Sequence, residues 1–159
     1  MSGELREKQD GAEKKRLRVR VWLRMLSCST VVEKRLRLRF VEQFDTTLPR
    51  FDVLATLKRY PQGATMGELS RALLVSGGNV TMLIRQLEAD GLVTRAADKA
   101  DKRTAIVKLT PLGSERFEVL AGAHHGWIEN MLSGLSKAEL NQLYQLLHKL
   151  KLSIAADKS

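Results

Sequence analysis

The chain has 159 residues, of which 43% are hydrophobic and 28% charged, a balance typical of one globular domain rather than a disordered chain. Lys and Arg outnumber Asp and Glu by 27 to 18, and the net charge of +9 favours a polyanionic partner, nucleic acid ahead of an anionic membrane. The single cysteine, Cys28, excludes an internal disulfide and is typical of a reducing compartment.

The N-terminus and the hydropathy of the chain bear on its location. No stretch approaches the roughly 18 apolar residues of a membrane-spanning helix, so no membrane partner is expected. Residues 1–13 are polar, unlike a secretory signal peptide, and offer little to bury. We therefore expect a disordered tail at residues 1–13 and a cytoplasmic protein.

A long helix is predicted from Lys14, because apolar residues recur every three or four positions over about 30 residues. The apolar stripe consists of Leu17, Val21, Met25, Cys28, Val32, Leu36, Phe40 and Phe44, flanked by Trp22 and Leu26. Residues 14–39 also contain ten Lys or Arg and one acid, Glu33. A chain of this size has little else to cover the stripe, so a second copy is the expected cover, with Cys28 buried.

Two shorter helices follow. Thr47 caps the first of them, and Pro49 is tolerated in its first turn. Thr65 and Glu68 form a capping box that begins the other. The predicted buried residues are Phe51, Leu54, Ala55 and Leu57 in one helix, and Leu69, Ala72 and Leu73 in the next.

A fourth helix, a hairpin and two more helices complete the chain. Ser76 caps the fourth helix, and Gly91 ends it in a left-handed turn. Its apolar face is Val80, Leu83, Ile84 and Leu87. Residues 92–95 and 104–109 predict two strands, and Thr110-Pro111 begins a helix that runs to about Leu132. Ser136 and Glu139 form a capping box that begins the last helix. The apolar stripe of that last helix is Leu140, Leu143, Leu147, Leu150 and Ile154. The predicted fold is mainly helical, with a small β-hairpin after four helices and two helices after it.

The fourth helix has a small, polar outer side, which is typical of a helix that enters the major groove of DNA. The residues off its apolar face are Gly77, Gly78, Asn79, Thr81, Met82 and Arg85. The glycines keep the first turn thin at about 1 kcal/mol each in helix propensity, which suggests a functional reason. Asn79 is suited to adenine, Arg85 to guanine or a phosphate, and the Thr81 methyl group to thymine. Ser76 and the free amides at the helix start are suited to a phosphate.

The loop between the strands, residues 98–103, carries Lys99, Lys102 and Arg103 and is expected to project as a finger. Arg103 is suited to a narrow minor groove, where negative potential is enhanced. Asp101 is predicted to hold the Arg103 guanidinium by charge-assisted hydrogen bonds. For this loop and the fourth helix, the alternative is an ordinary charged, solvated surface.

The chain resembles the MarR (multiple-antibiotic-resistance regulator) family of winged helix-turn-helix transcription factors. The matching segments are TTLPRFDVLATL (46–57), GELSRALLVSGGNVTMLIRQLEADGLV (67–93), DKR (101–103) and VKLTPLG (107–113). The resemblance covers about residues 14–155. The family's wing Asp and Arg correspond to Asp101 and Arg103. An acidic–arginine pair earlier in the loop is only partly matched, so Lys99 and Lys102 are expected to take backbone contacts.

This resemblance implies a homodimer in which residues 14–46 and 111–159 are dimerisation helices. Residues 47–110 would then be the winged helix-turn-helix lobe that binds double-stranded DNA at a pseudo-palindromic operator. It also implies a repressor that a small ligand releases.

Effectors in this family often lie between the dimerisation helices and the DNA-binding lobe. The residues suited to such a site are Trp22, Met25, Cys28, Ser29, Arg50, His124, His125 and Trp127. Together they suit an aromatic carboxylate or its coenzyme A thioester, and residues 20–36 are similar to regulators of aromatic-acid catabolism. The basic run, which is the ten Lys and Arg of residues 14–39, would then hold the coenzyme phosphates. The alternatives are that Trp22, Met25 and Trp127 are plain core, and that the basic run is a solvated or DNA-flanking surface.

Other functional classes are less favoured. Redox sensing through Cys28 needs an exposed, activated thiol, whereas its place in the stripe favours burial. His124 and His125 point about 100° apart on a helix, so no metal or cofactor is expected. No nucleophile–base pair or phosphate-binding loop is visible, so the protein is not expected to be an enzyme. A winged-helix module that binds RNA or protein is the remaining alternative.

Overall fold

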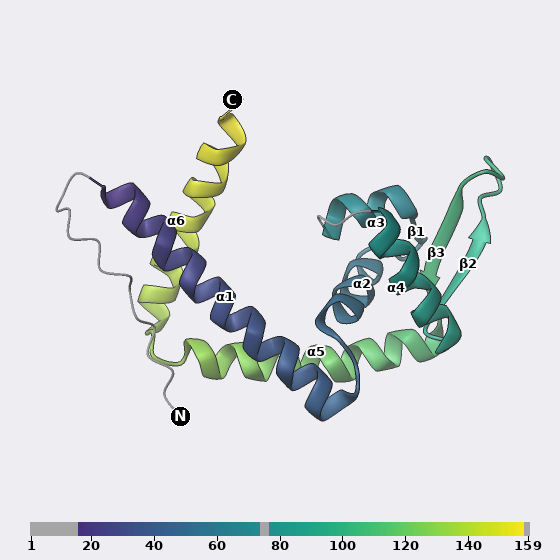
Figure 1. Ribbon diagram of the computed structural model, residues 1–159, viewed down its shortest axis with the longest axis horizontal. Helices are drawn as coiled ribbons and strands as arrows, with labels where there is room; N and C mark the ends of the chain where they lie inside the picture. The colour runs from purple at the N-terminus through teal and green to yellow at the C-terminus, as the bar shows by residue number, and fades with distance from the viewer. Residues whose placement is uncertain (1–15, 74–76, 158–159) are drawn as a thin grey trace. The chain divides into compact units, whose positions relative to one another are not determined.

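The computed structural model describes residues 16–73 and 77–157 (Figure 1). The helices and strands of this part are α1 (Leu17–Phe44), α2 (Leu48–Lys58), β1 (Ala64–Thr65), α3 (Met66–Leu73), α4 (Gly77–Ala89), β2 (Val93–Ala97), β3 (Ala105–Leu109), α5 (Pro111–Leu132) and α6 (Lys137–Ala156). The predicted order of helices and hairpin is confirmed. The expected tail at residues 1–13 and the predicted cap Ser76 lie outside the described residues. The chain divides into two compact units, Met1–His124 and His125–Ser159, each of which is described by itself.

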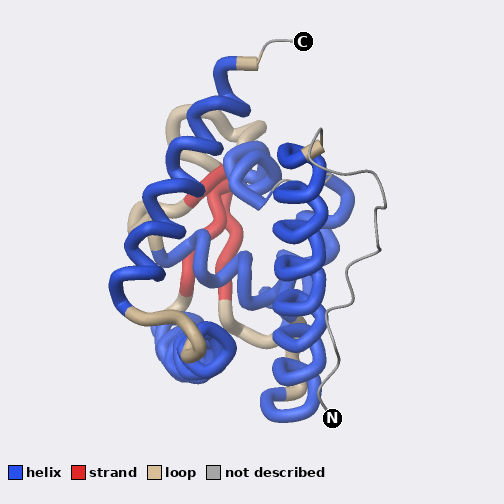
Figure 2. Tube along the Cα trace, turned by 90° about the vertical axis from the view of Figure 1, so that its left-hand side faces the viewer, coloured by secondary structure: helices blue, strands red, loops and turns tan. Residues whose placement is uncertain are grey.

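The strands, red in Figure 2, form a small antiparallel sheet. Their order in the sheet is β1–β3–β2. β2 and β3 pair from Val93 opposite Leu109 to Ala97 opposite Ala105, which is the predicted hairpin. β1 pairs with the other edge of β3, with Ala64 opposite Val107. This third strand is absent from the sequence prediction, since two residues are too few to show an alternating pattern. It ties the start of α3 to the sheet, because α3 begins directly after it.

The core of the first unit joins α1 to α2, α3, α4 and the sheet. Phe40 of α1 stacks on Phe51 of α2 with ring centroids 4.9 Å apart. The largest fully buried side chains include Phe40, Leu54, Leu57, Leu69, Ile84, Leu87, Leu120, Val53, Val80, Val93 and Val107. The predicted apolar face of α4 is confirmed in full. The prediction for α3 is wrong at Ala72, which is exposed, because the buried side of this short helix is limited to Leu69.

Polar caps begin helices where the sequence predicts them. The hydroxyl of Thr47 accepts a hydrogen bond from the main-chain N–H of Arg50 at 3.4 Å. Thr65 and Glu68 form reciprocal bonds of 2.7 and 3.1 Å, which confirms the capping box of α3. The bond from the main-chain N–H of Thr65 lowers the pKa of Glu68. The ionised carboxylate therefore stabilises the folded state, and this contribution is lost as the pH falls through the lowered pKa.

Large apolar side chains are exposed along α1 in the first unit and along α6 in the second. Those of α1 are Leu17, Val19, Val21, Trp22, Leu23, Leu26, Leu38 and Val41, and those of α6 are Leu140, Leu143, Tyr144, Leu146, Leu147, Leu152 and Ile154. Cys28 is also exposed in the single chain, so its predicted burial depends on the cover expected from a second copy. The physical reason is that the neighbouring apolar residues of α1 are themselves largely uncovered. No helix within residues 16–73 and 77–157 has the length and apolar character needed to cross a membrane.

Candidate nucleic-acid interface

α4 lies beside the β2–β3 hairpin (Figure 1). The polar side of this helix faces solvent. The helix is anchored by its apolar side, where Val80, Ile84 and Leu87 are 0% exposed. The opposite side is open: the exposed residues there are Gly77, Gly78, Asn79, Met82 and Arg85, with Thr81 half-buried. The described residues predicted to contact DNA from α4 therefore lie together on one side of one helix.

The two glycines at the start of α4 are not required by packing within the described chain. A Cβ atom added to Gly78 would meet nothing within 4 Å, and one added to Gly77 would meet only the hydroxyl oxygen of Ser70, at 4.0 Å. Neither glycine has the positive φ that excludes other residues. Their cost in helix propensity is about 1 kcal/mol each. We interpret them as leaving room for a molecule outside the chain.

Two further side chains extend the outer side of α4. The hydroxyl of Thr81 donates to the main-chain oxygen of Gly77 at 3.0 Å, which leaves its methyl group for an outside contact. Gln86 is exposed and lies one helical turn after Met82, but it is missing from the predicted set. Its amide has the donor and acceptor that adenine recognition uses. The spacing of four residues from Met82 is the signal that identifies it.

The loop at residues 98–103 is ordered by its own aspartates. The carboxylate of Asp98 accepts a hydrogen bond from the main-chain N–H of Ala100 at 3.2 Å. The carboxylate of Asp101 accepts from the main-chain N–H of Arg103 at 3.0 Å and from the hydroxyl of Thr104 at 3.1 Å. The prediction that Asp101 holds the Arg103 guanidinium is wrong in this structure, since Asp101 fixes the loop backbone instead. The exposed cations of the loop are Lys99, Lys102 and Arg103.

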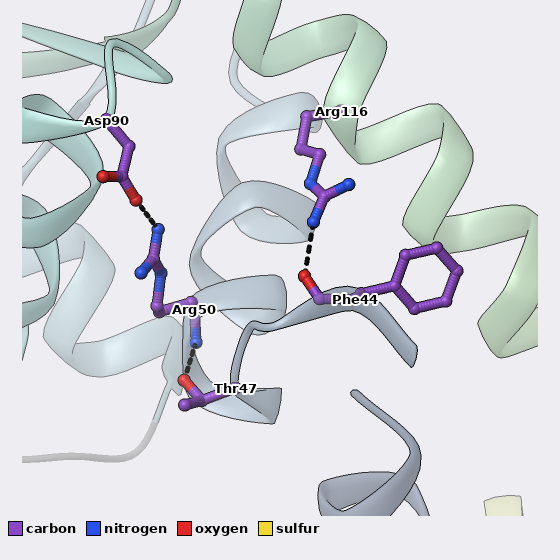
Figure 3. Close-up of polar contacts among 5 residues, drawn as sticks. All are labelled: Phe44, Thr47, Arg50, Asp90 and Arg116. Carbon is purple, nitrogen blue, oxygen red and sulfur yellow. Dashed lines mark hydrogen bonds and ion pairs between the residues drawn. The ribbon is translucent and has the colours of Figure 1, made fainter. Parts of the chain in front are cut away.

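Two ion pairs join the C-terminal end of α4 to neighbouring elements. Arg50, in the first turn of α2, pairs with Asp90, directly after α4 (Figure 3). The side chain of Arg50 is 18% exposed and that of Asp90 is 52% exposed. Glu88 of α4 pairs with Arg95 of β2 at 3.5 Å. Sequence alone places Arg50 in an effector site; in the structure its guanidinium is engaged by a residue 40 positions away.

The connection between α1 and α2, residues 44–47, is bonded to α5 and is called the α1–α2 elbow. It lies just before Arg50. A guanidinium nitrogen of Arg116 donates to the carbonyl oxygen of Phe44 at 2.7 Å (Figure 3). The same guanidinium lies 5.6 Å from the centroid of the Phe44 ring. Asp45 then turns the chain with a left-handed φ of 48°. The start of α2, and with it Arg50, is therefore fixed relative to α5 within the first unit.

A half-buried carboxyl group lies near the packing of α1 and α2. Burial raises the pKa of Asp52 in α2, while the nearby Arg37 opposes this shift and Glu33 adds to it. Arg37 and Glu33 are themselves paired at 2.6 Å. Because the folded state binds this proton more tightly than the unfolded chain does, ionisation of Asp52 costs stability as the pH rises through its raised pKa.

The effector residues predicted on α1 are accessible. Trp22 is 56% exposed, Cys28 and Ser29 are exposed, and Met25 is half-buried. The hydroxyl of Ser29 donates to the main-chain oxygen of Leu26 at 3.1 Å. Trp22 is therefore not a core residue of the single chain.

The remaining candidates of α5 have three different environments. His124 lies against Phe51 with ring centroids 4.9 Å apart, within an aromatic cluster of the first unit. In the second unit, His125 faces Glu129 one turn later at 3.6 Å, and Trp127 is buried, as the plain-core alternative predicts. None of these environments identifies an effector.

Known proteins share both the sequence pattern and the fold. The model of the MarR family matches residues 44–104, from the α1–α2 elbow through α4 and the hairpin loop. A crystal structure of a MarR family transcriptional regulator from Silicibacter pomeroyi is 29% identical, with a TM-score of 0.75, and the match covers 89% of this chain and 99% of that chain. The chain belongs to the MarR family.

Two other relatives bear on the function of this MarR family chain. The transcriptional activatory protein BadR of Rhodopseudomonas palustris is 36% identical over 104 residues, which are 64% of this chain and 59% of BadR. The match thus spans less than two thirds of that relative's length. The S. aureus MepR–DNA complex has a TM-score of 0.71 and 28% identity, and covers 86% of this chain and 97% of that chain.

Proposed function

We propose that this MarR family chain is a transcriptional regulator that binds double-stranded DNA through α4 and the hairpin loop. The observation that carries the proposal is the first turn of α4, where two exposed glycines that packing does not require stand beside Asn79 and Met82. The proposed DNA-contacting residues are Ser76, Gly77, Gly78, Asn79, Thr81, Met82, Arg85, Gln86, Lys99, Lys102 and Arg103, with Asp101 ordering the loop. The 28% identity to MepR, which has been crystallised with DNA, supports this assignment.

The working form in this proposal is a homodimer. Residues 14–46 and 111–159 are its dimerisation segments, and residues 47–110 are its DNA-binding lobe. The support is the apolar surface that one chain leaves open, such as Leu17 at 65%, Leu146 at 63% and Ile154 at 64% exposure. A two-fold axis would set the two copies of α4 about one helical turn of DNA, roughly 34 Å, apart. The operator would then be a pseudo-palindrome.

The proposed mode of regulation is repression that a small ligand relieves. The proposed ligand is an aromatic carboxylate or its coenzyme A thioester, and its support is the accessible Trp22 and Ser29 among the arginines of α1. A ligand that binds the non-matching form of the dimer more tightly by about 1–3 kcal/mol is sufficient to shift the equilibrium. BadR is named an activatory protein, so repression and activation need to be distinguished by experiment. A reporter gene does this, because deletion of a repressor raises transcription and deletion of an activator lowers it. A ligand panel scored by melting temperature and DNA release tests the effector.

Selection from a random duplex library tests DNA recognition and requires no assumed operator sequence. The purified protein is expected to enrich a pseudo-palindrome whose half-sites are about 10 base pairs apart from centre to centre. A library that remains unenriched after repeated rounds would refute sequence-specific recognition. Binding to RNA or to another protein would then better explain the exposed cations of α4 and the hairpin loop.

Replacing Arg103 by alanine is expected to weaken binding to the selected duplex by about 1–3 kcal/mol, because the variant loses an exposed cation in the hairpin loop. The melting temperature is expected to stay unchanged, since Arg103 contributes only its main-chain N–H to the loop. Arg59→Ala removes the same charge at the exposed C-terminal end of α2, outside the proposed DNA contacts and the dimerisation segments, and serves as the matched control. Equal affinities of the two variants, measured by fluorescence anisotropy, would contradict the role given to Arg103.

A further inference from the structure

Two ion pairs hold the C-terminal end of α4. The turn that would meet DNA is at the N-terminal end of the same helix. α4 has 13 residues, so it is about 20 Å long at 1.5 Å per residue. A tilt of about 5° around its C-terminal end would displace the first turn by about 2 Å. Hydrogen bonds to base edges tolerate much smaller displacements, since their lengths fall within about 0.5 Å of one another. Whatever fixes the last turn of α4 therefore governs recognition at the first.

Arg50 reaches this end of α4 from a rigid base. Its main-chain N–H is bonded to the Thr47 hydroxyl at 3.4 Å, within the cap of α2. One turn earlier, the elbow is bonded to α5 through Arg116 and the Phe44 carbonyl (Figure 3). The Arg50 side chain is largely withdrawn from solvent at 18% exposure, so its bond to Asp90 is screened less than an exposed pair. The pair thus connects the α1–α2 elbow to the end of α4.

We propose that Arg50 and Asp90 are positioning residues for DNA recognition: their ion pair sets the angle of α4 relative to α2 and to the elbow. The proposal rests on the proposed function of α4. Neither residue needs to touch DNA for this role. The second pair, Glu88 with Arg95 at 3.5 Å, joins the same end of α4 to β2. The hairpin and α4 therefore keep their mutual position while Arg50 fixes both to α2.

Removing the charge of Asp90 distinguishes a positioning role from simple repulsion between this carboxylate and the DNA phosphates. If Asp90 only repelled the phosphates, Asp90→Asn would tighten binding to every duplex, because a negative charge is removed. A positioning role predicts the reverse for the selected duplex, since the released end of α4 misplaces the first turn. Arg50→Met is the complementary variant, because the half-exposed carboxylate of Asp90 is readily solvated once its partner is gone.

The experiment compares full-length variants on the selected duplex and on a scrambled duplex at several salt concentrations. Arg50→Met and Asp90→Asn are each expected to bind the selected duplex on the order of tenfold more weakly, with unchanged binding to the scrambled one. The slope of log affinity against log salt is expected to stay constant, because no phosphate contact is lost. The swapped variant Arg50→Asp/Asp90→Arg is expected to recover most of the affinity. Arg59→Met, which removes an exposed cation at the other end of α2, is the matched control.

Three results would overturn the proposal. They are unchanged affinity in both single variants, equal losses on both duplexes, and a salt slope that falls by about one in Arg50→Met, which marks a direct phosphate contact. Circular dichroism and the melting temperature establish that each variant is folded, and recovery in the swapped variant separates a broken pair from general damage. Failure of the unaltered protein to discriminate between the duplexes would refute the proposed function instead.

Discussion

A chain shortened to end at Ser133 is expected to be monomeric, because it lacks α6 (Lys137–Ala156). Seven large apolar side chains of this helix are exposed by 38% to 71%, among them Leu140, Tyr144 and Leu152. At about 25 cal/mol per Å² of apolar area, covering several such side chains contributes several kcal/mol to a dimer. Loss of that contribution raises the dissociation constant on the order of a thousandfold. Sedimentation velocity at micromolar concentration measures the change.

The control for this truncation is a chain that ends at Ala156, which keeps the whole of α6. It is expected to dimerise like the full chain. Circular dichroism should show that the shortened chain keeps the helices of the first unit, since the buried residues of that unit come from elements before α6. A stable dimer of the chain that ends at Ser133 would place the interface outside α6, and a monomeric full chain would refute the dimer altogether.

Gly113→Ala is expected to lower the free energy of unfolding by about 3 kcal/mol, on the scale of overpacking in a fixed core. Gly113 lies at the start of α5, where a Cβ atom would overlap the main-chain carbonyl of Leu92. The neighbourhood is rigid: Thr110 donates its N–H to the Leu92 oxygen at 3.1 Å, and its hydroxyl caps the N–H of Gly113 at 2.9 Å. Main-chain atoms cannot give way as a flexible side chain does. Calorimetry is expected to show a melting temperature lower by roughly 10 °C.

Gly122→Ala in the same helix is the matched control. A Cβ atom there would meet nothing within 4 Å, and alanine favours the helix by about 1 kcal/mol over glycine. The control is therefore expected to be as stable as the unaltered chain or slightly more stable. Equal stability of the two alanine variants would show that α5 does not approach Leu92 as closely as described.

Features that depend on a few neighbouring residues can be predicted from the sequence. The capping boxes at Thr65 and Ser136 are formed, because each needs only a side chain and a main-chain group three residues apart. The buried face of α4 is also predicted in full, since one helix period determines it. Gly91 has the predicted positive φ, 72°.

Features that join distant parts of the chain could not be predicted in this way. Nothing in the local sequence pairs Arg50 with Asp90, or Arg116 with the Phe44 carbonyl, since 40 and 72 residues separate them. The strand at Ala64 forms because β3 offers an edge, not because its two residues favour a strand. Cys28 is exposed in the single chain, because apolar periodicity predicts a face that needs to be covered without showing which surface covers it.

The proposed function depends above all on α4 reading the sequence of duplex DNA. The measurement that tests this most directly is the ratio of the dissociation constants for the scrambled and the selected duplex, at one stated salt concentration near physiological. A specific regulator is expected to give a ratio of about 10³ or more. A ratio near one, with both affinities falling equally as salt rises, would contradict sequence reading by α4. It would show that the protein binds DNA only through non-specific electrostatic attraction.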